Sequence, residues 1–127
     1  MSPNVETYRR AIRKIIDRMG VSVTYHNRVK SGETSYGEPT YNVVDYTLKV
    51  AYRHLRMEDT RYVEAGFLPQ HYLYLFLNYD DVTWTMNEMI DTVDYGGETY
   101  IVRLVIPIKV GTDIAYYKLL IRRKAMV

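Results

Sequence analysis

Residues 41–56, YNVVDYTLKVAYRHLR, alternate apolar and polar side chains with a period of two. One face carries Val44, Tyr46, Leu48, Val50 and Tyr52, and the opposite face carries Asp45, Thr47, Lys49 and Arg53. This pattern predicts an antiparallel strand with one face in a core and the other in water. A length of about fifteen residues predicts a strand that bends around a small barrel and protrudes beyond it.

Further strands are predicted on both sides of this one, most of them at hairpin spacing. They cover residues 21–29, 72–79, 93–95, 98–110 and 114–123, with a possible short strand at 61–65 and an ambiguous segment at 84–90. A strand within 98–110 that contains Pro107 is expected to lie at an edge, bulge or corner. About six or seven strands without crossover helices predict a mainly β fold, a small antiparallel β-barrel or sandwich.

One amphipathic helix is predicted at the N-terminus, over about residues 3–19. Ser2 and Pro3 are typical of a helix start, and Gly20 is expected to end the helix in a left-handed conformation. Its apolar stripe consists of Val5, Tyr8, Ile12, Ile15, Ile16 and Met19. Its basic side consists of Arg9, Arg10, Arg13, Lys14 and Arg18, a surface for DNA phosphates or an acidic partner, or simply a solvated face.

Two more surface features follow from the pattern. The outward row of Tyr72, Tyr74 and Phe76 could stack bases, but aromatic rows on a sheet more often lie beneath a helix, and the N-terminal helix is the expected cover. Residues 30–40, which follow the first strand and include SGETSYGEPT, are rich in Gly and small polar residues and predict a long mobile loop.

The composition indicates one domain over residues 1–127. A net charge of +2 permits contact with nucleic acid without requiring it, and the absence of Cys excludes disulfides and thiol chemistry. Tyr occurs 14 times against two Phe, which suits half-buried sheet positions and wet interfaces. No signal sequence or membrane span is expected, so the predicted protein is soluble, with no membrane partner.

Catalytic motifs are missing from the sequence. The histidines His26, His54 and His71 lack metal-ligand spacing, and the acidic pairs Asp80–Asp81 and Asp91/Asp94 border predicted turns, where Asp is common. Neither a nuclease Glu-x-Lys pattern, a phosphate-binding glycine loop nor a nucleophile elbow is present. The expectation is therefore no enzyme, no metal site and no cofactor.

The C-terminal half carries a recognisable hairpin pattern that ends in a strand with Tyr116, Tyr117 and Arg122. Its residues are Asp91, Val93, Tyr95, Gly96, Gly97, Tyr100 and Val102. This pattern, over about residues 62–123, resembles the small head-completion proteins of tailed phages, the stopper or head–tail connector proteins. The basic helix and the abundance of Tyr depart from that family's pattern.

The resemblance implies a structural virion protein at the head–tail junction, made in the host cytoplasm. It implies a homo-oligomeric ring that contacts the portal or adaptor and tail proteins, around a lumen through which DNA passes without sequence recognition. The loop at residues 30–40, with Lys30, Glu33, Tyr36 and Glu38, is the channel-loop candidate, slightly acidic and so able to gate DNA without gripping phosphates. A tail terminator or tail-tube subunit and, in another class, a nucleic-acid-binding β-barrel module are the alternatives.

Overall fold

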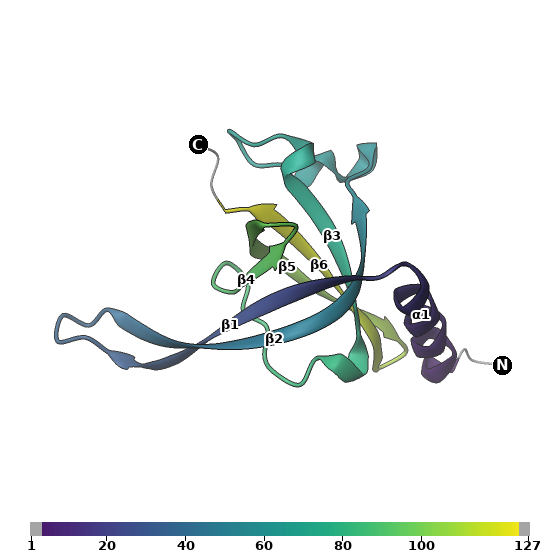
Figure 1. Cartoon of the computed structure of the whole chain (residues 1–127), viewed down its shortest axis with the longest axis horizontal. Coiled ribbons are helices and arrows are strands. Elements are labelled where there is room, and N and C mark those ends of the chain that lie inside the picture. The colour runs from purple at the N-terminus through teal and green to yellow at the C-terminus, as the bar shows by residue number, and fades with distance from the viewer. Residues whose placement is uncertain (1–3, 125–127) are drawn as a thin grey trace.

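A computed structural model describes residues 4–124 of the chain. It is mainly β, as the sequence predicts, with one helix, α1 (Val5–Met19), followed by six strands (Figure 1). The strands are β1 (Val21–Glu33), β2 (Pro39–His54), β3 (Tyr72–Asn78), β4 (Thr92–Tyr95), β5 (Glu98–Val110) and β6 (Asp113–Arg123).

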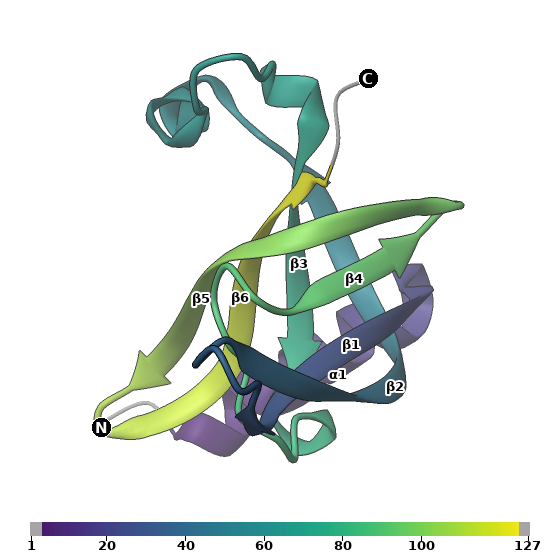
Figure 2. The ribbon, with the colours of Figure 1, turned by 90° about the vertical axis from the view of Figure 1, so that its left-hand side faces the viewer.

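The six strands form one antiparallel sheet that closes on itself in the order β1-β2-β3-β6-β5-β4. Figure 2 shows the strands crossing around the enclosed core, with α1 outside them. The ring is irregular because its closing seam is short: β1 and β4 pair only from Thr24 opposite Asp94 to His26 opposite Thr92. Most of the sheet is instead joined through the long β1–β2 and β5–β6 pairings.

The interior is filled by alternate side chains from every strand. Its buried members are Val23, Tyr25, Val50, Leu73, Leu75, Leu77, Val93, Tyr100, Val102, Leu119 and Ile121. The predicted core face of residues 41–56 enters this interior only near its middle. Val50 is fully buried and Tyr46 and Leu48 are half-buried, whereas Val44 and Tyr52 are exposed. The strand therefore extends beyond the core at both ends.

Strands β1 and β2 extend far beyond the ring as a two-stranded ribbon, which projects to the left in Figure 1. The predicted long mobile loop over residues 30–40 is therefore wrong in extent. Lys30 pairs with Tyr41 and Glu33 with Pro39, so only residues 34–38 form the turn. The small polar residues near the tip tolerate strand geometry because both faces of a protruding ribbon are in water.

Helix α1 lies outside the ring, over β2, β3 and β6. It begins at Val5, and the Asn4 side chain accepts a hydrogen bond from the Glu6 N–H; the predicted cap at Ser2 and Pro3 lies outside the described residues. Gly20 ends the helix, but in an extended rather than a left-handed conformation. A glycine fits here because a Cβ would lie 2.2 Å from the Ile16 carbonyl oxygen.

The connection between β2 and β3 covers part of the outer face of the sheet. It contains 3-10 turns at Met57–Tyr62 and Pro69–His71, so the predicted strand at 61–65 is not formed. Tyr72 and Tyr74 are buried beneath this connection, not beneath α1; of the predicted outward row only Phe76 lies next to the helix. The Tyr74 hydroxyl donates to the Asp59 carboxylate, and burial raises the pKa of Tyr74 to about 12.

The hairpin predicted around two glycines is confirmed. Gly96 and Gly97 have φ of +60° and +81°, the left-handed pair that a two-residue turn between twisted strands needs. The expectation for Pro107 is also confirmed, because β4 pairs with β5 only from Glu98 to Ile101 and leaves the later part of that edge without a partner strand. The ambiguous segment at 84–90 forms neither a helix nor a strand.

Candidate assembly surfaces

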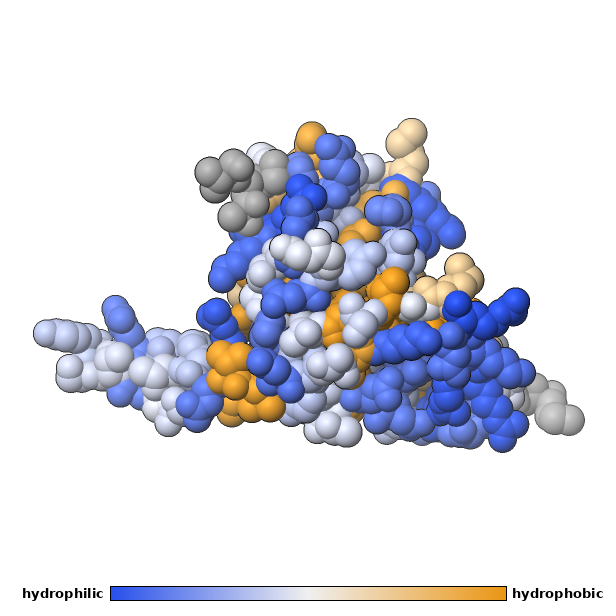
Figure 3. All heavy atoms as spheres, in the orientation of Figure 1, coloured by the Kyte–Doolittle hydropathy of each residue, from blue (hydrophilic) through white to orange (hydrophobic). Residues whose placement is uncertain are grey.

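The outer part of the ribbon exposes apolar side chains on both faces. Val29 and Val44 continue the core-facing side, and Val43 and Tyr41 lie on the other side, each between 38% and 55% exposed. Figure 3 shows hydrophobic surface at the base of the ribbon, where it leaves the ring. Side chains of this size on a strand pair outside any core are typical of a surface that contacts another protein.

The ribbon tip is a compact turn that displays one aromatic side chain. The Thr34 N–H donates to the Glu38 carbonyl, and the Thr34 hydroxyl accepts from the N–H groups of Tyr36 and Glu38. Tyr36 is 92% exposed, the highest exposure among the large apolar side chains of residues 4–124. Of the channel-loop candidates, Lys30 and Glu33 lie within β1 and bind each other at 3.2 Å, whereas Tyr36 and Glu38 lie in the turn.

Two of the molecule's strand edges, on β5 and on β2, differ in protection. The β5 edge beyond β4 is covered: Val102 exchanges hydrogen bonds with residues 89 and 91, the Val105 N–H donates to Glu88, and Pro107 has no N–H. The outer edge of β2 from Pro39 to Val50 faces no strand, because β3 pairs only with Ala51–His54. A long uncovered edge invites strand addition, and natural proteins usually protect it.

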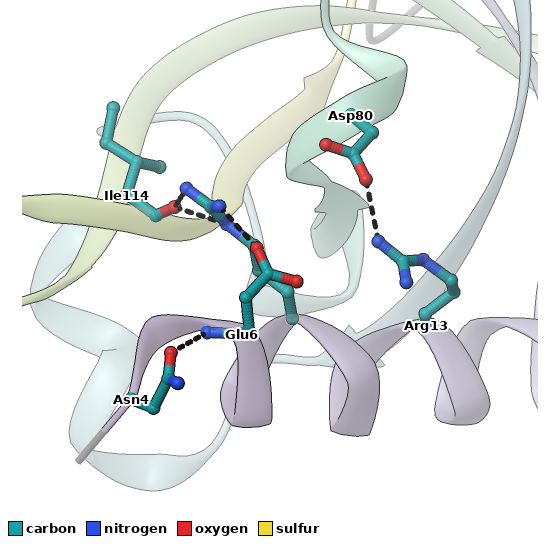
Figure 4. Close-up of polar contacts among 6 residues, drawn as sticks. Asn4, Glu6, Arg13, Asp80 and Ile114 are labelled. Carbon is teal, nitrogen blue, oxygen red and sulfur yellow. Dashed lines mark hydrogen bonds and ion pairs between the residues drawn. The ribbon is translucent and has the colours of Figure 1, made fainter.

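The five basic residues of α1 divide into two groups. Arg9 and Arg13 border the sheet: the Arg9 guanidinium donates to the Ile114 carbonyl and lies over the Tyr79 ring, and Arg13 binds Asp80 at 2.6 Å (Figure 4). Two of the five are therefore already engaged within the chain, and contact of the basic side with DNA or an acidic partner stays a prediction. Arg10, Lys14 and Arg18 are exposed and make no ion pair with residues 4–124, and these three remain available to a partner.

Asp91, the first residue of the Asp91–Val102 hairpin pattern, is an internal anchor. Its carboxylate is fully buried and accepts hydrogen bonds from the Tyr25 hydroxyl at 2.5 Å and the Asn27 amide at 3.0 Å. It also accepts from the backbone N–H groups of Arg28 and Asn87. These bonds join the connection before β4 to β1, so Asp91 stabilises the ring at its seam.

The other hairpin residues are structural as well. Val93, Tyr100 and Val102 are buried in the interior, and Tyr95 packs against its rim. The hairpin pattern thus describes how the chain crosses the core and turns at Gly96 and Gly97. It supplies no exposed constellation of reactive groups.

His26 lies on the outer face between two carboxylates. Its Nδ1 is 2.6 Å from the Asp45 Oδ1 on β2, and its Nε2 is 2.7 Å from the Asp94 Oδ2 on β4. The hydrogen bonds to Asp94 and Asp45 raise the pKa of His26, and the same contact with His26 lowers the pKa of Asp94. Sequence analysis missed this triad because its members lie 19 and 68 residues apart and meet only through strand register.

Two negative findings apply to residues 4–124. No group of three or more His, Cys, Asp or Glu residues there is arranged to hold a metal ion. Within the same residues, no helix has the length and apolar character needed to cross a bilayer.

Comparisons with known proteins give a structural likeness but no family. No protein-family model matches the chain, and no curated protein matches it. The fold is similar to the solution structure of protein SF1141 from Shigella flexneri 2a, with a TM-score of 0.56 and 13% sequence identity over 84% of this chain and 93% of that one. At 13% identity the likeness extends to the fold alone.

Proposed function

We propose that this protein is a structural virion component at the head–tail junction of a tailed virus, where it assembles as a ring that joins portal or adaptor to tail. The observation that carries the proposal is the protruding β1–β2 ribbon, whose outer edge is open and whose faces expose apolar side chains. The sequence resemblance of the Asp91–Val102 hairpin to head-completion proteins supports the same role. In this proposal DNA passes through the lumen, and the tip residues Tyr36 and Glu38 lie toward the channel.

The asymmetry of the two edges supports a ring in this proposal. A protected edge on β5 and an open edge on β2 make the two sides of each subunit unlike. Contacts between unlike surfaces, repeated by a rotation that closes, generate a ring. A tail terminator or tail-tube subunit would use the same geometry, so these remain the alternatives within this class.

Assembly can be tested with the purified protein, alone and mixed with the portal complex encoded by the same genome. Light scattering and negative-stain images should show rings, and Val43→Lys should abolish them because it places a charge on the exposed apolar ribbon. Leu68→Lys is the matched control, since Leu68 is 51% exposed and Val43 is 55% exposed, but Leu68 lies on the β2–β3 connection. Monomers under all these conditions, or rings that tolerate Val43→Lys, would contradict the proposal.

The ribbon can also be shortened without disturbing the ring of strands. Lys30 and Tyr41 are paired, so replacing residues 31–40 by Asn-Gly leaves a two-residue turn between them. We expect unchanged thermal unfolding and viral particles that fail to retain packaged DNA. Retained DNA in particles that carry the shortened protein would refute the channel role of the tip.

A nucleic-acid-binding module is the alternative from another class, and the exposed Arg10, Lys14 and Arg18 favour it. Such binding would weaken steeply with salt, because phosphate contacts release counterions. Salt-sensitive binding of a DNA duplex, lost in the Lys14→Glu variant and without ring formation, would favour that class. Portal, capsid and tail genes next to the coding sequence would favour the virion role.

A further inference from the structure

Beside α1 lies an apolar groove of about 490 Å³. Its helix side is formed by Ile12, Ile15 and Met19, and its sheet side includes Ala51, Tyr52 and Phe76. This groove is separate from the ribbon and from the ring seam, and nothing in the proposed ring contact occupies it.

Only part of the apolar stripe of α1 packs against the sheet. Ile16 is 1% exposed, whereas Ile15 is 46% and Met19 73% exposed, with Tyr8 at 44% on the same side of the helix. Burial of such exposed apolar side chains in an interface favours association. The open half of the stripe therefore retains much of the driving force for association.

The charges beside the groove have one sign. At 100° per residue, Lys14 and Arg18 follow Ile15 around the helix, on the side away from the sheet. Neither forms an ion pair with a described residue, and Arg10 continues the same row. A ligand that fills the groove must therefore carry apolar side chains on one face and acidic ones next to it.

We propose that this groove binds an acidic amphipathic helix of a partner protein. A helix fits because the ridge formed by Ile12, Ile15 and Met19 has the i, i+3 and i+7 spacing that packs against another helix. A second copy of α1 fits poorly, because it would bring its own Lys14 and Arg18 against the same cations. A nucleic acid fits poorly too, because phosphates would leave Ile15 and Met19 in water.

The test uses the full chain and two synthetic peptides about as long as α1, with identical Leu positions at helical spacing. One peptide has Glu at the surrounding positions and the other has Lys. We expect the acidic peptide to bind at least about tenfold more tightly in calorimetry, with an affinity that falls as salt is added. Amide shifts in NMR should map to Ile15, Met19 and Ala51.

Two substitutions distinguish peptide binding in the groove from binding elsewhere on the protein. Met19→Glu should weaken binding of the acidic peptide at least about tenfold, because it places a negative charge in the groove that the peptide's Glu residues approach. Met57→Glu is the matched control, because Met57 is 86% exposed on the β2–β3 connection. Circular dichroism of both variants should be unchanged, since both side chains are exposed.

Four results would overturn the inference. The first three are equal binding of the two peptides, unchanged peptide binding by the Met19→Glu variant, and self-association that Met19→Glu abolishes. DNA duplex binding that is independent of Met19, with no peptide binding, would also overturn it. The inference does not depend on ring formation, so failure of the peptide test leaves the proposed virion role standing, and the converse holds too.

Discussion

Replacing Asp91 by Asn should destabilise the fold far more than an equivalent surface change. The carboxylate accepts four hydrogen bonds at 2.5 to 3.0 Å, from Tyr25, Asn27, Arg28 and Asn87, in a fully buried position. An amide in its best orientation turns its NH₂ group toward the Arg28 N–H, so one bond becomes a donor–donor contact. The other three bonds lose the charge that strengthens them.

The magnitude follows from these contacts. Leaving a buried donor unpaired costs about 1 to 3 kcal/mol, and weakening three charge-assisted bonds adds to it. We therefore expect Asp91→Asn to lower the free energy of unfolding by about 2 to 4 kcal/mol. For a chain of this length, that corresponds to a fall in Tm of about 8 to 16 °C.

The assay is urea and thermal unfolding followed by circular dichroism. Asp81→Asn is the matched control, because Asp81 is exposed and accepts a single side-chain hydrogen bond, from Asn78. A double-mutant cycle with Tyr25→Phe should give a coupling energy above about 0.5 kcal/mol, because the two side chains share a 2.5 Å bond. If Asp91→Asn costs no more than Asp81→Asn, the anchoring role is wrong.

Two further predictions concern the seam and the hairpin turn. Because the pKa of His26 is raised above 6.5, the stability from its contacts with Asp45 and Asp94 is complete below pH 6.5 and is lost as pH rises through the folded pKa. The difference in unfolding free energy between wild type and His26→Gln should therefore fall from acid to alkaline pH, by no more than about 1 kcal/mol because both carboxylates are exposed. A difference that does not change with pH would contradict this. Gly96→Ala should lower the free energy of unfolding by about 1 to 2 kcal/mol, measured by thermal unfolding. The loss comes from its φ of +60° alone, since nothing lies within 4 Å of the added Cβ. Gly32→Ala is the control and should cost less, because the φ of Gly32 is not left-handed.

Much of the local structure was predictable because side-chain period sets which residues share a face. Alternation along residues 41–56 predicted a strand too long for the core, and the 3.6-residue stripe of α1 predicted the helix. The turn at Gly96 and Gly97 was predictable from these two residues alone. The limits of the mobile loop were misjudged, because glycine-rich sequence is also compatible with a strand when its partner strand supplies the hydrogen bonds.

The candidate sites were less predictable, since they depend on which distant residues meet. The sequence identified Arg9 and Arg13 as basic helix residues, but only the docking of α1 brought them to Ile114 and Asp80. It likewise indicated that Tyr72 would face outward, but the cover that it predicted, the N-terminal helix, was wrong, because the β2–β3 connection packs there instead.

The sequence by itself determined a mainly β chain with one amphipathic helix, no cysteine chemistry and a protruding strand, because these depend on composition and on contacts between near neighbours. Only the tertiary structure decided that the sheet closes at His26, that Asp91 holds the seam, and that the β2 edge stays open. Closure and register arise from pairings across 60 or more residues, such as His26 with Asp94, and no local period encodes such pairings.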